Sequence, residues 1–473
     1  MDCRFEQDSF PSRLPDYLKM AINGSFCPFI KPLHKTNPTG LIARLPFKAT
    51  FQKSFLSKIK KACNQDSQLG ERTMSFQFKS LCLLVLIVTS TLVFTSQSVS
   101  GQDAMSPIWK NGLGFSTADG KNKISLGGRL QIDTGFFSEE DGVDVEEDGV
   151  RMRRGRIALS GLINGNIEFK TQYDFTGGDA DFKDFYMGFL NKGSMPDMIS
   201  KIRVGQQYEP FGLETLISSK YITFAERSFT DVFSPSRNTG ILAFMDPFEN
   251  MDSSFALGVF KDDNGYGNAQ GDNEQAVTGR LTLAPINEKD GTILHLGVGF
   301  SSRKNPGATI SYDANALSSL GEDIVTGSLA SEQVDLLGFE AAYSQGPLSL
   351  QAEMVQSSLD TADATAWYLM ASYFLTGESR PYKASSGVFS RIKPANNQDD
   401  AGSGALELAV RITEIDLEEM TAGEEAEAVT VGLNWYLNPN SRIMFNLTNA
   451  SPGEGSAYGN DVTSFVTRFA VNF

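Results

Sequence analysis

Residues 166–175 read NIEFKTQYDF, and apolar and polar side chains alternate through the whole stretch. Successive side chains of a β-strand leave opposite faces, so Ile167 and Phe169 point one way while Glu168 and Lys170 point the other. A strand in a soluble sandwich turns its apolar face to a dry core. Here the opposite face is strongly charged, which indicates a barrel with lipid outside and water inside.

The same alternation continues from Ile124 to the end of the chain. It predicts an all-β fold, a transmembrane antiparallel β-barrel of about sixteen strands, an even number as closed bacterial barrels require. The expected strands lie at 122–136, 150–162, 165–175, 181–190, 199–207, 238–246, 252–261, 274–284, 291–302, 333–345, 347–357, 364–376, 402–415, 427–437, 441–449 and 461–473.

The links between these strands differ in length from one end of the barrel to the other. Odd-numbered strands are followed by long polar links, and even-numbered strands mostly by tight turns, which is typical of outer-membrane barrels. The long links include 137–149, 208–237, 262–273, 303–332 and 450–460. One link, 377–401, is long but falls on the short-turn side. It is either an ordered periplasmic segment or contains an unrecognised hairpin.

The first hundred residues differ from the rest. Residues 81–94, LCLLVLIVTSTLVF, form an apolar run that follows Lys79 and is short for a membrane-spanning helix. We expect an upstream mis-start or disordered extension at 1–73, a signal peptide at 74–101 cleaved after Gly101, and a short periplasmic segment at 102–121. The barrel would occupy 122–473. The alternative is a cytoplasmic extension before an uncleaved anchor.

Cysteine and charge limit the possible chemistry. All four cysteines precede Gly101, so a mature chain would hold neither a disulfide nor a thiolate metal site. Cleavage there would leave 28 Lys and Arg against 51 Asp and Glu, a net charge of −23. Such acidity disfavours nucleic acid as a partner. The sequence predicts no cofactor and no metal site.

Several motifs carry a family resemblance. Residues 205–240, GQQYEPFGLETLISSKYITFAERSFTDVFSPSRNTG, resemble the phosphate-selective porin O and P family, as do RMRRGRIALSG (151–161), LTGESRPY (375–382) and GLNWYLNPN (432–440). The similarity spans 122–473. It implies a sixteen-stranded, typically homotrimeric porin in the bacterial outer membrane, embedded in lipid and lipopolysaccharide, that passively admits small hydrophilic solutes. Anions such as phosphate or polyphosphate would be the solutes.

The link after the fifth strand is rich in aromatic residues, including Phe211, Tyr221 and Phe224. Such a loop needs a surface to pack against, and we expect it to fold inward and narrow the lumen. The alternative is a trimer contact or a surface lid. Basic residues near this constriction would favour phosphate, because guanidinium groups pair two oxygens at once. The candidates are Arg203, Lys220, Arg227 and Arg237.

The opposite interpretation is that Glu214 and Glu226 neutralise these bases and that the ion pairs only hold the loop to the wall. Alternation also assigns the basic residues of the wall that face the lumen. They are Arg129, Arg154, Arg156, Lys170, Arg280 and Arg411, together with Arg442 and Arg468. The acidic residues on the same face are Asp133, Glu168, Asp174, Asp184, Glu340, Glu353 and Glu407.

Two further features concern the rims. Phe473 ends an alternating strand, as in the C-terminal signal that the barrel assembly machinery recognises. Seven acids lie in 138–149 and seven in 414–427, neither with a basic residue. These acids either bind divalent cations that bridge to lipopolysaccharide or form a solvated surface, which we favour.

Three rival functions stay open. One is a general porin with weak selectivity, and another is a structural or adhesive barrel. The third is an outer-membrane enzyme, which needs a nucleophile and a base within hydrogen-bond reach. His295, the one histidine after residue 101, has no such pattern around it, and we interpret it as a lumen-wall residue bonded to water.

Overall fold

The computed structural model describes residues 104–109, 112–139, 147–248, 250–261, 275–304, 308–398, 401–453, 456, 459 and 461–473. The expected signal peptide, the Gly101 cleavage site and the residues before them lie outside the described residues. So do most of the acidic run at 138–149 and the link at 262–273. No helix in the described part is long and apolar enough to cross a membrane.

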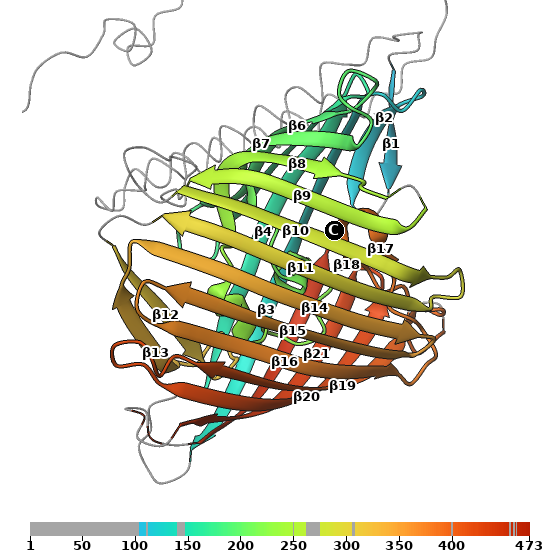
Figure 1. Ribbon diagram of the computed structural model, residues 1–473. Coiled ribbons are helices and arrows are strands. Elements are labelled where there is room, and N and C mark those ends of the chain that lie inside the picture. Colours follow the sequence, from blue (N-terminus) through green and yellow to red (C-terminus); the bar gives the residue numbers. More distant parts are fainter. Residues whose placement is uncertain are drawn as a thin grey trace, which may run out of the picture. The chain divides into compact units, whose positions relative to one another are not determined.

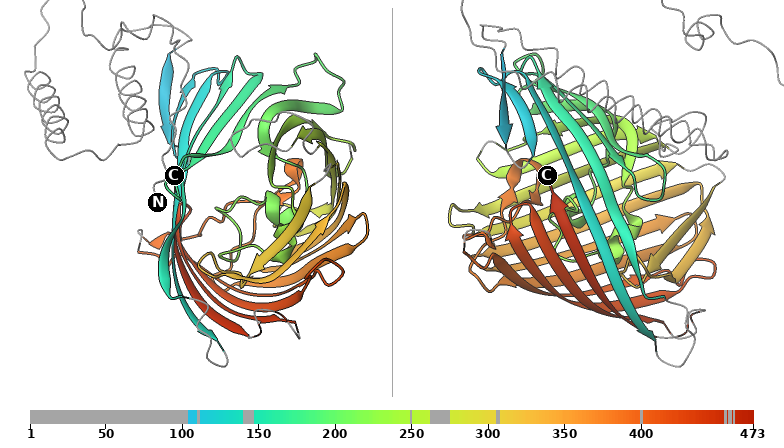
Figure 2. Two further views of the ribbon diagram at one scale, coloured as in Figure 1. Left: turned by 90° about the vertical axis from the view of Figure 1, so that its left-hand side faces the viewer. Right: turned by 180° about the vertical axis from the view of Figure 1, so that it is seen from behind.

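The described strands of the main sheet form a closed antiparallel barrel of sixteen strands (Figures 1 and 2). The last strand pairs with the first across Arg468 and Asp133, which closes the ring. The barrel strands are β3 (Lys123–Glu139), β4 (Gly149–Ile163), β5 (Ile167–Asp174), β6 (Asp181–Leu190), β7 (Ile199–Tyr208), β8 (Arg237–Met245), β9 (Asp252–Lys261), β10 (Gln275–Asn287), β11 (Ile293–Lys304), β14 (Gln333–Gln345), β15 (Leu348–Leu359), β16 (Asp363–Phe374), β19 (Ala405–Asp416), β20 (Glu425–Asn438), β21 (Ser441–Pro452) and β22 (Val462–Asn472).

The predicted fold is therefore confirmed, and each observed strand end lies within three residues of the expected one. The two faces separate as the alternation requires. Outward side chains such as Phe339 (54% exposed) and Leu369 (53%) form an apolar belt, whereas Arg468 and Glu407, on the inner face, are buried. A lipid environment covers the first set, and the inward segments described below cover the second.

Two strands precede the barrel. In the segment at 102–121, β1 (Met105–Trp109) pairs with β2 (Leu113–Thr117), and β2 pairs with the start of β3. At the closing end of the barrel, the backbone N–H of Gly128 donates to the carbonyl of Phe473 at 2.7 Å. A Cβ on Gly128 would lie 2.6 Å from the Phe473 ring, so the terminal aromatic needs a glycine beside it.

Two of the long links contain hairpins. Residues 303–332, expected only as a polar link, hold β12 (Thr309–Asn315) and β13 (Asp323–Ala330), which pair with each other and not with the barrel. The link at 377–401 holds a short hairpin, β17 (Tyr382–Lys383) and β18 (Val388–Phe389), around the 3₁₀ turn η4 (Ala384–Ser386). The link therefore contains a hairpin that was not predicted, and this hairpin is separate from the barrel sheet.

Candidate pore constriction

The segment between β7 and β8, residues 209–236, lies inside the barrel (Figure 2). It contains a single helical turn, α3 (Leu213–Leu216), and a 3₁₀ helix, η3 (Phe229–Phe233). Its phenylalanine side chains are almost fully buried, with Phe211 at 0% exposed and Phe224 and Phe229 at 1%. The prediction that this loop folds inward and packs against the wall is confirmed.

Glycines in the wall make room for these aromatic rings. Gly299 on β11 and Gly338 on β14 are directly opposite each other. A Cβ at either position would lie 3.1 Å from the ring of Phe211, which is closer than normal packing allows. Gly432 on β20 stands in the same relation to Phe224, also at 3.1 Å. The wall thus holds the loop through shape as well as through charge.

A wall carboxylate holds the start of the loop. Glu353 on β15 accepts the backbone N–H groups of Leu213 at 2.7 Å and Glu214 at 2.6 Å. The hydroxyl of Tyr368 donates to the same carboxylate at 2.5 Å. These N–H groups begin the short turn α3 and have no partner within it, so the carboxylate satisfies donors that would otherwise be buried and unpaired.

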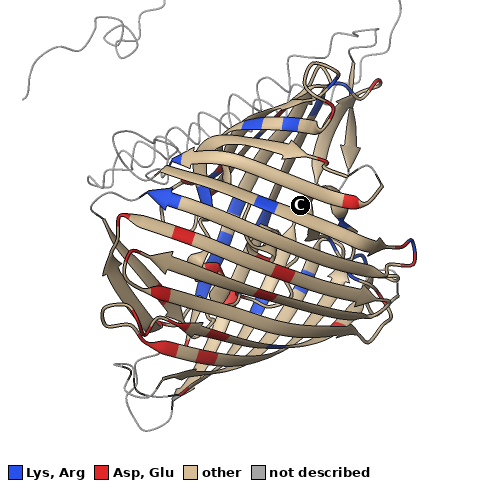
Figure 3. Cartoon of the chain, viewed as in Figure 1, with Lys and Arg blue, Asp and Glu red and all other residues tan. Residues whose placement is uncertain are grey.

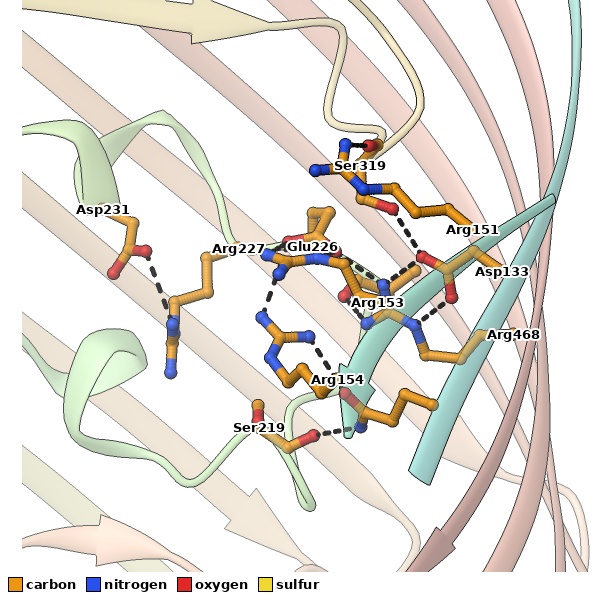
Figure 4. Close-up of polar contacts among 12 residues, drawn as sticks. Asp133, Arg151, Arg153, Arg154, Ser219, Glu226, Arg227, Asp231, Ser319 and Arg468 are labelled. Carbon is orange, nitrogen blue, oxygen red and sulfur yellow. Dashed lines mark hydrogen bonds and ion pairs between the residues drawn. The ribbon is translucent and has the colours of Figure 1, made fainter. Parts of the chain in front are cut away.

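An arginine cluster holds the middle of the loop (Figure 4). The guanidinium of Arg153 donates to both oxygens of Glu226, at 2.7 and 2.8 Å, and Arg468 donates to one of them at 2.6 Å. Arg154 lies 3.8 Å from the other oxygen. Arg468 also pairs with Asp133 through two nitrogens, at 2.6 and 2.5 Å. We call Arg153, Arg154, Arg468, Asp133 and Glu226 the seam cluster.

A β-bulge supplies one member of this cluster. On β3, Gln131 and Ile132 are consecutive, but their partners on β4 are Arg154 and Met152, so Arg153 is the extra residue. A bulge shifts the alternation by one position. Arg153 and Arg154 therefore both reach Glu226, although they are neighbours in sequence.

Arg227 binds within the loop itself. Its guanidinium donates to the carbonyls of Glu214 at 2.9 Å, Thr215 at 3.1 Å and Ile217 at 3.1 Å, and it lies 3.4 Å from Asp231. Backbone carbonyls use most of its donors. This position favours a role in holding the loop's own shape over one in contacting a solute.

The segment from the opposite rim meets the loop inside the barrel. Phe389 packs in one buried cluster with Leu213, Ile217 and Ile222. On the wall side, Arg280 donates to the carbonyl of Ser386 at 3.1 Å and that of Gly387 at 2.8 Å. Two inward segments, one from each rim, thus narrow the lumen together.

A comparison with protein-family models matches residues 124–473 to the phosphate-selective porin O and P family. The chain belongs to this family. It is a porin of the bacterial outer membrane, a channel for passive diffusion.

Two curated relatives are similar to this porin. Porin O of Pseudomonas aeruginosa is 27% identical over 412 residues, which cover 77% of this chain and 91% of that one. An uncharacterised protein of Caulobacter vibrioides is 26% identical over 363 residues, covering 72% and 70%. Among solved structures, the Pseudomonas putida OprB structure has a TM-score of 0.49 at 9% identity, over 75% of this chain and 95% of that one. An anion-selective porin from Comamonas acidovorans has a TM-score of 0.46 at 13% identity, over 74% and 100%.

Most of the expected basic residues of this porin's wall have acidic partners. Arg203 donates to Glu168 at 2.5 Å, and Arg237 to Asp184 at 2.8 Å. The remaining pairs are Arg156 with Asp174 at 2.6 Å, Lys170 with Asp184, Arg280 with Glu340 at 2.6 Å and Arg411 with Glu214 at 3.3 Å. Glu214 and Glu226 do hold the loop to the wall, but through Arg411 and the seam cluster and not by pairing with Lys220, Arg227 or Arg237.

Five cations at or beside the two inward segments, Arg129, Lys220, Arg380, Arg391 and Arg442, have no described carboxylate within ion-pair distance. Lys220 and Arg129 belong to this group, and Arg129 donates to the hydroxyl of Ser219 instead. Arg391 donates to the Pro439 carbonyl at 2.6 Å, and Arg442 to the Ile222 carbonyl at 2.7 Å. Arg380, the fifth, donates to Ser349 and Gln351. We call this group the unpaired cations.

Lys220, on the loop, lies close to other positive charges. Burial, followed by the nearby Arg129, Arg391 and Lys170, lowers the pKa of Lys220 to about 7. Its ammonium group is therefore charged below neutral pH and loses its charge above it. Lys220 and Arg391 also line a small cavity with Arg442 near the turn between β20 and β21.

Charge is unevenly distributed around the wall. In Figure 3, Lys and Arg are prominent on β4 to β11, and Asp and Glu on β14 to β20. Among the wall acids, Glu353 and Glu407 carry no arginine or lysine partner and bond instead to tyrosine hydroxyls, at 2.5 Å from Tyr368 and 2.8 Å from Tyr436. Basic residues therefore predominate on one side of the wall and acidic residues on the other.

Sequence reasoning missed several functional residues. Arg153 was assigned no place, because strict alternation puts it on the lipid face. The double arginine in RMRRGR was the available signal for a bulge. Arg380 and Arg391 lie in the link that was not assigned to the lumen. Glu209 accepts from Arg303 at 2.9 Å inside the barrel, and neither residue was predicted.

His295 has protein partners on both ring nitrogens. Its Nε2–H donates to Glu340 at 3.1 Å, and its Nδ1 accepts from the hydroxyl of Tyr382 at 2.7 Å. The expectation of a water-bonded histidine was wrong, because the hairpin at 382–389 reaches the wall at this point.

Proposed function

We propose that this porin is anion-selective and that phosphate or polyphosphate is among the solutes it passes. The observation that carries the proposal is the set of unpaired cations inside the barrel, Arg129, Lys220, Arg380, Arg391 and Arg442. A cation without a carboxylate adds uncompensated positive charge to the electrostatic field that a mobile anion meets in the pore. This chain's own family is described as phosphate-selective, and its relative in Pseudomonas aeruginosa is named Porin O, which supports the proposal.

The expected anion-binding residues differ in how far acidic partners neutralise them. Lys220 stays the strongest candidate because it is unpaired and lies on the constriction loop. Arg203 and Arg237 share their carboxylates with a second cation, Lys201 at 3.7 Å from Glu168 and Lys170 beside Asp184, so positive charge is in excess there. A weakly selective general porin is the second candidate, since most wall arginines are paired.

Planar-bilayer recording of the purified porin tests the proposal. In a potassium chloride gradient, the reversal potential should have the sign of an anion-selective channel, and added phosphate should reduce the chloride current. Unblocked currents without ion preference would favour the general porin. A protein that forms no channel but hydrolyses lipid or peptide would favour the enzyme.

We further propose a homotrimer in contact with lipid and lipopolysaccharide, exported by a signal peptide cleaved after Gly101. Family membership supports the trimer, and the outward apolar belt supports lipid contact. Light scattering in detergent should give the mass of three chains. Mass spectrometry should find a chain that begins at Gln102. Deleting Phe473 should slow insertion if the assembly machinery recognises it.

A further inference from the structure

A cavity of about 240 Å³ lies inside the barrel, between the wall and the two inward segments. Side chains of β5 to β10 form one side of it. Pro210 and Leu216 of the constriction loop form another, and Ser385, Ser386 and Val388 of the segment from the opposite rim form the third. The cavity therefore lies where the two inward segments approach the wall, on the lumen side.

The wall of this cavity is unusually apolar for a lumen. Leu242 and Phe244 are separated by one residue on β8 and face inward, opposite Arg203 and Lys201 on β7. Tyr186, also in the lining, belongs to the inner face of β6 and pairs with Lys170 on β5. The inner face of a porin strand normally carries polar side chains. Leu242 and Phe244 pack with Phe260 in one apolar cluster, so this part of the inner wall is an apolar surface beside the cations.

Arg203 and Lys201, the cations beside the apolar wall, share one carboxylate partner and lie next to aromatic rings. The guanidinium of Arg203 lies over the rings of Tyr186 at 4.3 Å and Phe244 at 4.9 Å, while its Nε donates to Glu168 at 2.5 Å. The ammonium of Lys201 lies 4.5 Å from the centre of the Phe244 ring. Aromatic faces stabilise a cation and leave the N–H edge of the guanidinium open to a ligand.

The net charge around the cavity is positive but small. Glu168 forms ion pairs with Arg203 and Lys201, and Asp184 forms ion pairs with Arg237 and Lys170. Two carboxylates therefore face four cations, and Arg280, the other cation of the lining, is fully paired with Glu340. An anion of single charge gains from this excess. A multiply charged anion gains more from the cations but also meets two nearby carboxylates.

The cost of removing water differs between inorganic phosphate and an aromatic monocarboxylate. Inorganic phosphate would lose water against Leu216, Leu242 and Phe244, which offer no hydrogen bond in return, and this loss is costly. An aromatic monocarboxylate has no such conflict, because its ring replaces water on the apolar side and its carboxylate meets the Arg203 edge. The size also fits, since an apolar cavity of roughly 150 Å³ holds a benzene molecule.

We propose that this cavity binds aromatic monocarboxylates on their way through the pore, in preference to inorganic phosphate. The inference rests on the proposed anion channel and names a class of solute for it. Arg203 would position the carboxylate, and Phe244 with Leu216 would contact the ring.

Planar-bilayer recording with three sodium salts tests the inference. Benzoate, acetate and phosphate are added in turn to wild-type channels that conduct chloride. Benzoate should halve the chloride current at a concentration about tenfold below that of acetate, the gain expected from burying a ring. Acetate carries the same charge without the ring. Equal potency of benzoate and acetate, or stronger block by phosphate than by benzoate, would overturn the inference.

A pair of phenylalanine variants locates the site. Phe244→Ala should raise the half-blocking concentration of benzoate about tenfold and leave that of acetate unchanged. Phe339→Ala, which removes an outward-facing ring from β14, is the control and should change neither. If the wild-type channel fails to conduct or prefers cations, the proposed function fails. If it prefers chloride but does not distinguish benzoate from acetate, only this inference fails.

Discussion

Glu226 is the acceptor on which three arginines converge, and its charge is the basis of the first prediction. Replacing it in Glu226→Gln leaves Arg153, Arg154 and Arg468 facing a neutral amide. Removing one partner of a buried ion pair costs about 3–5 kcal/mol, because the remaining charge is uncompensated. We expect the temperature at which the folded electrophoretic mobility is lost to fall. Glu332→Gln, at an exposed rim position, is the control. Equal melting of both variants would contradict the anchoring role of Glu226.

Lys220 predicts a pH dependence. Its pKa of about 7 means that the ammonium is charged at pH 6 and largely neutral at pH 8. The anion preference of the channel should therefore decrease as the pH rises through 7, measured as a shift of the reversal potential. Lys220→Arg keeps the charge at both pH values and should abolish the shift. A shift of the same size in this variant would exclude Lys220 as the titrating group.

Individual side chains were the least predictable part of the site. The lumen-facing residues of the regular strands followed from parity, as Arg203 and Glu168 illustrate. Their partners did not, because an ion pair across strands depends on register and on which loop lies opposite. Arg153 is an example. It is an extra residue in β4, and it switches the face on which all earlier residues of that strand lie.

At the scale of elements, the constriction loop packs against glycines of the wall. A substitution of Gly338 tests whether this packing holds the loop. In Gly338→Ala the new Cβ would lie 3.1 Å from the buried ring of Phe211. Overpacking of this kind costs about 1–3 kcal/mol, so the variant should melt at a lower temperature than the wild type. Gly155→Ala is the matched control, because its Cβ would meet only Thr176, at 3.6 Å. If both variants melt like the wild type, Phe211 is not held by shape.

The link at 377–401, which enters the barrel from the short-turn rim, should affect the noise of the channel current. Phe389 is 2% exposed and packs against the constriction loop. Phe389→Ala removes a large buried side chain at a cost of about 3–5 kcal/mol, which should loosen the segment and increase fluctuations of the open-channel current. Val429→Ala, an outward position on β20, should leave the noise unchanged. Unaltered noise in the phenylalanine variant would mean that other contacts hold the segment.

Strands were far easier to predict than the segments between them. Lipid on one side and water on the other impose a two-residue period on every barrel strand, which explains why all sixteen were found. The hairpin β12–β13 and the turn at η4 face no such boundary. Their positions depend on contacts distant in sequence, such as Phe233 with Tyr312 at 4.7 Å between ring centres, and a single sequence does not encode those contacts as a pattern.

The whole barrel combines an acidic exterior rim with cations in its interior. Salt screens these two regions differently, because the Debye length is about 10 Å at 0.1 M and about 3 Å at 1 M. Mobile anions should feel the interior cations most strongly at low salt. We expect the anion preference to be larger in a gradient centred near 0.1 M than in one centred near 1 M. A preference for cations at low salt would mean that the rim acids dominate instead.

The seam cluster connects the first and last strands of the barrel to the loop within it. Asp133 comes from β3, Arg468 from β22, and Glu226 from the constriction loop, and one guanidinium bonds both carboxylates. The cluster is complete only when these two strands have paired. A half-inserted chain with open edges would lack the anchor that seats the narrowing loop. Closing the barrel and positioning the constriction loop would then occur together. A closed barrel would therefore always contain its narrowed lumen.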